Sequence, residues 1–137
     1  MSTPFGILAV PASGMNVMQT WINAISDNVA NADNVTNPDD PNFFHQSYVV
    51  GSAIPGADGG IGQGVALSGI EKSSGQGTLV FDPNNPAADA NGTVRHPDVD
   101  VTEQMTSLII AQRAYSANVN VFEQARDAYK QALESGK

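Results

Sequence analysis

The sequence contains no cysteine among its 137 residues. This excludes disulfide bonds, thiol catalysis and the cysteine-rich zinc sites that stabilise many small domains. The two histidines, His45 and His96, lie far apart in the sequence. Residues 87–98 approximate the spacing of a calcium loop, but Ala87 stands at the first ligand position, so we predict turns there. We therefore expect no metal and no cofactor.

Basic residues are scarce as well. The first 71 residues carry no Lys or Arg, and the chain has a formal net charge of −8. Nucleic acids and anionic membrane surfaces both attract basic patches, so we expect neither as a partner. A cleaved signal peptide needs a basic start, and a transmembrane helix needs a longer apolar run than any found here. We expect no direct membrane insertion, and any export to proceed without a cleaved signal.

Signatures of enzymes are also missing. The glycine-rich stretch GGIGQG (59–64) lacks the spacing of a dinucleotide-binding loop, and no helix is predicted after it. No pairing of a nucleophile with a base can be assembled from the spacing of the remaining polar residues. The sequence therefore favours a protein that is not an enzyme.

What the sequence does contain is helical periodicity at both ends. Near the N-terminus, apolar residues recur at heptad spacing, and the pattern stops at the Asn-, Asp- and Pro-rich stretch that begins near residue 31. Pro11 and Gly14 lie inside this helix and are predicted to kink it or split it. The residues predicted to form its packing seam are Met15, Met18, Ile22, Ile25 and Val29.

The C-terminal segment predicts one long helix. Asp100 and Glu103 resemble a capping box, and neither Gly nor Pro occurs from there to about Leu133. At 1.5 Å per residue the helix would be roughly 50 Å long. Large residues at heptad spacing predict a seam against the first helix or a neighbouring subunit: Met105, Leu108, Tyr115, Val119, Phe122 and Tyr129.

A second stripe on this helix consists of small residues, which allow another helix to approach closely. Its members are Ala111, Ala114, Ala125, Ala128 and Ala132. Since the chain offers one other long helix, we expect this stripe to receive neighbouring chains. Gln112 and Arg126 interrupt the seam of large residues. They either keep their polar ends in water or fix the register between helices.

The middle of the chain changes character, since most of the glycines and prolines lie between the two helical segments. Short strands are predicted at 43–50, 64–70 and 77–81, separated by turns. The expected fold is mainly α, with long N- and C-terminal helices packed as a two-helix, coiled-coil-like core. We expect this helical unit to comprise 1–33 and 99–137, and a small, irregular, β-rich segment to occupy 34–98.

Two motifs resemble a known family. SDNVAN (26–31), which contains Asn28, Ala30 and Asn31, resembles the N-terminal motif of flagellar rod, hook and filament-type axial proteins. The stretch 82–105, followed by AQRAYSANVNV (111–121) with Arg113, Tyr115 and Asn118, is more specific. It resembles flagellar basal-body proximal rod proteins of the FlgC type.

The resemblance implies a structural role in bacterial motility. Such proteins are exported through the flagellar type III apparatus and polymerise through their terminal helices into the periplasmic rod, the drive shaft that transmits torque. The implied partners are copies of itself, other flagellar rod proteins, and the membrane (MS) ring or export-gate end of the rod. The alternatives are another axial protein, such as another rod or hook-related subunit, or a small helical adaptor or export chaperone.

Overall fold

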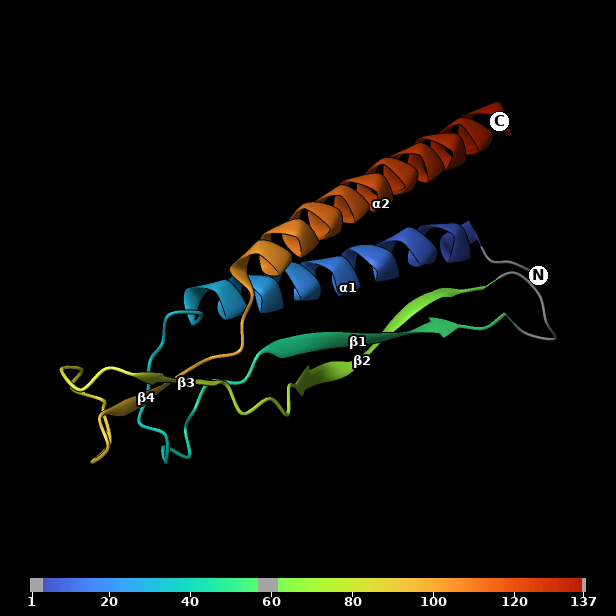
Figure 1. Cartoon of the computed structure of the whole chain (residues 1–137). Helices are drawn as coiled ribbons and strands as arrows, with labels where there is room; N and C mark the ends of the chain where they lie inside the picture. The colour runs from blue at the N-terminus through green and yellow to red at the C-terminus, as the bar shows by residue number, and fades with distance from the viewer. Residues whose placement is uncertain (1–3, 57–61, 137) are drawn as a thin grey trace.

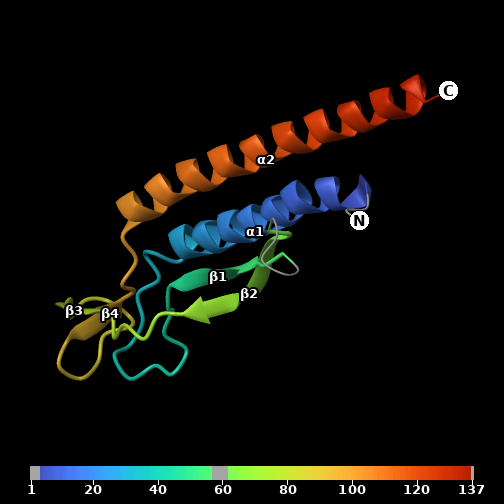
Figure 2. The ribbon, with the colours of Figure 1, turned by 90° about the vertical axis from the view of Figure 1, so that its right-hand side faces the viewer.

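The structure is a computed structural model that describes residues 4–56 and 62–136. Two long helices, α1 and α2, run antiparallel, and a β-hairpin of strands β1 and β2 lies along α1 (Figure 1). Figure 2 shows the same order after a quarter turn, so α1 is the middle layer between α2 and the hairpin. The predicted fold class, mainly helical with a small β-containing middle, is confirmed.

Helix α1 spans Pro4–Ala30 without interruption, so the prediction that Pro11 and Gly14 split it is wrong. Proline removes one backbone donor but does not by itself end a helix that is packed on both sides. Here Pro11 is buried, and contacts on opposite sides hold the following turn. The Ser13 hydroxyl accepts a hydrogen bond from the backbone N–H of Val65 in the hairpin, at 3.1 Å. Gly14 lies against Asn118 of α2.

Helix α2 spans Val101–Ser135 and begins as the capping pattern predicts. The Asp100 carboxylate accepts hydrogen bonds from the backbone N–H groups of Thr102 and Glu103, at 2.8 and 3.2 Å. With 35 residues against 27 in α1, α2 is the longer helix. Figure 1 shows its C-terminal turns extending past the start of α1. The end of α2 is consequently left without a helical neighbour in the described chain.

The hairpin pairs β1 (Ser47–Ile54) with β2 (Gly64–Lys72). The predicted strand 64–70 is confirmed, whereas the one at 43–50 begins too early. Two glycines allow the hairpin to approach α1. A Cβ on Gly51 would touch Val17, and one on Gly64, whose φ is +111°, would collide with Ser13.

A smaller sheet pairs β3 (Thr78–Phe81) with β4 (Thr93–His96), and an isolated bridge joins β4 to the loop at Thr36. The strand predicted at 77–81 is confirmed, but the prediction of turns throughout 87–98 is wrong at β4. The tight turn at Gly92, with φ +73°, directs the chain back against β3.

Phe43 forms the small core behind this sheet. Its ring is buried, the Arg95 guanidinium lies 5.2 Å from the ring centre, and His45 meets it edge-on. These contacts take the segment around Phe43 into the core instead of into a strand. The proposed division into a helical unit and a separate middle segment remains a prediction, because the hairpin packs directly on α1.

Candidate assembly site

A buried asparagine joins three elements of the fold. Asn28 is 1% exposed, and its amide oxygen accepts a hydrogen bond from the backbone N–H of Ser47 at the start of β1, at 2.8 Å. Its amide nitrogen donates to the Ser47 carbonyl at 2.9 Å and to the Gln104 side-chain oxygen at 3.0 Å. Both amide hydrogens and the oxygen therefore have partners, which a carboxylate or an apolar side chain of similar size cannot provide. We call Asn28, Ser47 and Gln104 the polar junction.

The rest of the SDNVAN motif ends α1. The Asn31 side chain donates to the Asp27 backbone carbonyl at 2.8 Å and to the Asp27 carboxylate at 3.1 Å. It therefore adds a second donor to a carbonyl that already accepts the Asn31 backbone N–H, at 3.1 Å. Ala30 is exposed and is the last residue of α1. The motif thus fixes where the helix stops and how α1 meets β1 and α2.

The two helices come closest through small and polar residues. A Cβ on Gly14 would lie 2.8 Å from the Asn118 amide oxygen, so any larger residue at this position on α1 would displace the Asn118 side chain. Asn118 in turn donates to the Ala114 carbonyl in its own helix, at 3.0 Å. Ala111 is 0% exposed. The contact face of α2 therefore runs through Gln104, Ala111 and Asn118, which recur every seven residues.

This placement overturns part of the predicted small-residue stripe. The expectation that Ala111 receives neighbouring chains is wrong, since it is fully buried within the chain itself. Ala114 and Ala125 are half-buried, whereas Ala128 and Ala132 near the end of α2 are exposed. The reason is that Ala111 shares one face of α2 with Gln104 and Asn118, and both of these residues contact α1.

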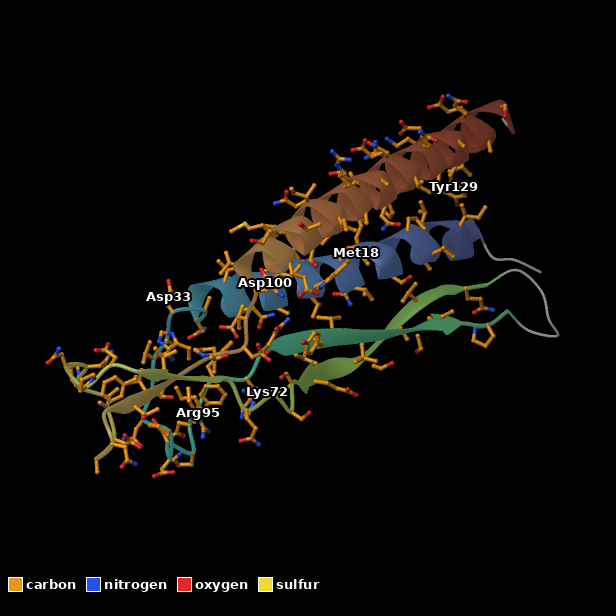
Figure 3. The ribbon with its side chains drawn as sticks, in the orientation of Figure 1. Met18, Asp33, Lys72, Arg95, Asp100 and Tyr129 are labelled. Carbon is orange, nitrogen blue, oxygen red and sulfur yellow. The ribbon has the colours of Figure 1, made fainter. Side chains whose placement is uncertain are left out.

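The predicted seam of large residues is divided by the structure. Leu108, Tyr115, Val119 and Phe122 are half-buried, whereas Met105 is 44% exposed and Tyr129 is also exposed. Figure 3 places Tyr129 on the side of α2 that faces the N-terminal turns of α1. On α1, Ile25 is buried, and the other four predicted residues are half-buried: Met15, Met18, Ile22 and Val29.

The opposite face of α2 carries an open, shallow groove of about 390 Å³. It is nearly flat, because one helical face alone lines it, with Ile109, Gln112, Arg113, Ser116, Ala117 and Asn120. Ile109 is 53% exposed, and Ile110 beside it is equally exposed. Gln112, which the sequence placed within the seam, therefore faces outward, as does the exposed Arg126.

Arg113 is the charged residue of this groove. Among the described residues the one ion pair joins Arg126 and Asp127, at 3.1 Å. Arg113 therefore has no carboxylate partner within the described part of its own chain. Apolar, small and uncompensated cationic side chains together make this outer face suited to contact with another polypeptide. We call the six residues that line it the outer groove.

Gln104 and Ser47 of the polar junction were missed by the sequence analysis. Gln104 lies seven residues before Ala111, in the heptad phase of the small-residue stripe, but it is polar and was not counted among the small residues. Ser47 takes part through its backbone N–H and C=O groups, which every residue except proline has, so the sequence could not identify it. A polar residue near the start of a long helix, combined with the Asn28 motif, was the available signal.

No group of His, Asp and Glu that could hold a metal ion occurs among residues 4–56 and 62–136. Within the same ranges, neither helix is apolar enough over a sufficient length to cross a membrane.

Comparison with known proteins identifies the family. Residues 90–135 match the family model described as "Flagellar basal body rod FlgEFG protein C-terminal". The flagellar basal-body rod protein FlgC of Yersinia enterocolitica is 36% identical over 132 residues, which cover 96% of each chain. FlgC of Salmonella typhimurium is 32% identical and covers 96% of each chain, and FlgC of Bacillus subtilis is 30% identical and covers 98% of this chain and 99% of its own. The chain belongs to the family of the flagellar basal-body rod protein FlgC.

Proposed function

We propose that this chain is a structural subunit of the flagellar basal-body rod, which polymerises through its two terminal helices into the shaft that transmits torque. The observation that carries the proposal is the outer groove of α2. It exposes apolar side chains and Arg113 on the face directed away from α1. In a monomer these apolar side chains stay exposed to water, whereas packing of helices from neighbouring subunits would bury them.

The internal packing supports the same proposal. The polar junction fixes α1, α2 and β1 relative to one another, so that the outer face is presented by a subunit of defined shape. The overhanging turns of α2, with exposed Tyr129 and Leu133, provide further apolar surface for neighbouring subunits. Ala128 and Ala132 in the same turns allow a close approach. We propose that copies of this chain and other rod proteins occupy these surfaces.

The finer features of the role follow from the same proposal. We place the subunit in the periplasmic, proximal part of the rod, near the membrane ring or export-gate end, with export that needs no cleaved signal. It acts by assembly and carries out no catalysis. The family membership supports this reading.

The test is the substitution Ile109→Glu, which places a carboxylate in the outer groove at a position that α1 does not cover. We expect the isolated variant to keep the helicity and melting temperature of the parent, because Ile109 is exposed. Rod assembly and swimming in a strain that lacks the parental gene should be lost. Gln124→Glu, a change at another exposed position of α2 that does not line the groove, is the matched control.

Normal rods and normal motility with Ile109→Glu would refute the assignment of the outer groove to subunit contacts. A loss of folding in the isolated variant would instead show that the groove is part of the core. Loss of assembly by Gln124→Glu as well would show that any added charge on α2 is harmful, and would remove the groove's special role.

A further inference from the structure

The outer edge of strand β3 is an apolar strand edge that the chain leaves open. All four residues of Thr78–Phe81 are exposed, with Leu79 at 58% and Phe81 at 73%. Strand β4 covers one side of β3, and β4 is itself covered by the bridge to Thr36. Within the part of the chain that the structure describes, nothing pairs with the other side of β3.

The hydrogen-bond pattern shows which backbone groups face outward. Asp82, directly after β3, donates its N–H to the Gly92 carbonyl at 2.9 Å, so it faces the β4 side. Backbone groups alternate along an antiparallel strand, and Val80 therefore faces β4 as well. Arg95, which lies opposite Leu79, exchanges both of its backbone bonds with Thr36, at 2.8 and 3.0 Å. Leu79 and Phe81 consequently present their N–H and C=O groups to the open edge.

Such an edge is a template for an additional strand, and proteins usually protect it with charge, proline or a covering segment. Strand β3 has no charged residue and no proline. The segments that flank the strand differ from it, because an acidic residue lies near each of its ends. Asp82 follows the strand directly, and the exposed Asp98 lies beside Gly75, three residues before the strand begins, where a Cβ would be 3.3 Å from an Asp98 carboxylate oxygen.

The charges around the edge select the occupant. Lys72 and Arg95 are the only Lys or Arg residues in the first 112 positions of the sequence. The Arg95 guanidinium lies over the Phe43 ring. A second copy of β3 would bring the same acidic ends together, and the chain already carries a net charge of −8. We propose that this edge takes an extended, apolar segment of a different polypeptide, with basic residues at both of its ends, as an added antiparallel or parallel strand.

This site is independent of the outer groove, because β3 lies in the small sheet beyond the end of the helix pair (Figure 1). This second contact surface has its own chemistry: backbone hydrogen bonds at Leu79 and Phe81, and ionic contacts near the two ends of the strand. Failure of either test leaves the other surface untouched.

The experiment uses the full chain labelled with nitrogen-15 and the blocked peptide KTVTVTVK as the probe. We expect the amides of Leu79 and Phe81 to exchange quickly with solvent in the free protein and to become protected when the peptide is added. Val80, which already faces β4, should change little. The peptide ETVTVTVE, with acidic ends, should bind about tenfold more weakly, since it meets Asp82 and Asp98 with like charge.

Two variants distinguish the contribution of the backbone hydrogen bonds along β3 from that of the acidic residues near its ends. Leu79→Pro removes an outward N–H that the β3–β4 pairing does not use, so the sheet should persist and peptide binding should be lost. Asp98→Lys leaves the backbone edge intact and should reduce the preference for basic over acidic peptide several-fold. It also keeps the proposal testable if Leu79→Pro does not fold.

Several outcomes would overturn the proposal. Unchanged exchange at Leu79 and Phe81 with saturating peptide would show that the edge does not accept a strand. Equal binding of the basic and acidic peptides would refute the charged ends. Protection of the same amides without peptide, rising with protein concentration, would assign the edge to a second copy of this chain.

Discussion

Removal of the Asn28 side chain tests the polar junction most sharply. Asn28→Ala eliminates three hydrogen bonds and leaves the N–H and C=O of Ser47 and the Gln104 amide oxygen without that partner. A typical bond contributes about 1 kcal/mol net, and an unsatisfied buried group costs about 1–3 kcal/mol. Because Asn28 is almost fully buried, water cannot replace the amide without a rearrangement of α1 and β1. We expect a loss of about 3 kcal/mol in the free energy of unfolding.

The assay is urea unfolding followed by helical circular dichroism, with the free energy extrapolated to water. Asn23→Ala is the matched control, because Asn23 is an exposed asparagine on the same helix whose side chain accepts one bond from Gln19, at 3.2 Å. We expect the control to change stability by less than about 0.5 kcal/mol. A loss for Asn28→Ala no larger than that of the control would refute the junction as a determinant of the fold.

The remaining predictions concern the helix contact, the helix ends and one carboxylate. Gly14→Ala should destabilise the parent by about 1–3 kcal/mol, because the added methyl group is too close to Asn118. In an Asn118→Ala background the same change should stabilise the protein by about 0.5–1 kcal/mol, because alanine is the better helix former. Additive effects of the two substitutions in a double-mutant cycle would contradict this contact. Amides in 126–135 of the isolated chain should exchange roughly 100-fold faster than those in 104–118, and hydrogen exchange showing equal protection would contradict the uncovered end. The Thr93 backbone N–H donates a hydrogen bond to the Asp89 carboxylate and lowers the pKa of this group below 3.8. The ionised carboxylate therefore stabilises the fold above pH 3.8, and this stabilisation is lost as the pH falls through the lower folded-state pKa. An NMR titration midpoint at or above 3.8 would contradict the contact.

Much of the architecture follows from periodicity and capping. Asp100 marks the start of α2, and the absence of Gly and Pro after it predicts one unbroken helix, as found. The turn-rich stretch after Asn31 marks the end of α1 in the same way. These features are local, because each depends on residues within one or two turns of the chain.

Features that depend on the third dimension could not be predicted in the same way. The sequence placed Ala111 on a surface for neighbours because its stripe is separate from the large residues. In the structure, Ala111 lies on the same face of α2 as Gln104 and Asn118, which contact α1, so it is buried within the chain. Pro11 disrupts a helix in isolation but is tolerated where α2 and the hairpin hold both sides. Strand β4 was missed because its pairing depends on the turn at Gly92 and on Phe43 behind it.

Ala111 lies on the face of α2 that packs on α1, and we propose that other subunits contact the outer groove on the opposite face. Because the chain has no cysteine, a single introduced thiol reports on one position. The most direct measurement is the rate of maleimide labelling of Ala117→Cys in the outer groove, in the isolated chain and in assembled basal bodies. Ala111→Cys, buried against α1, serves as the reference. We expect Ala117→Cys to react rapidly in the isolated chain and to be protected in the rod, while Ala111→Cys is protected in both. Equally rapid labelling of Ala117→Cys in assembled rods would contradict the central claim.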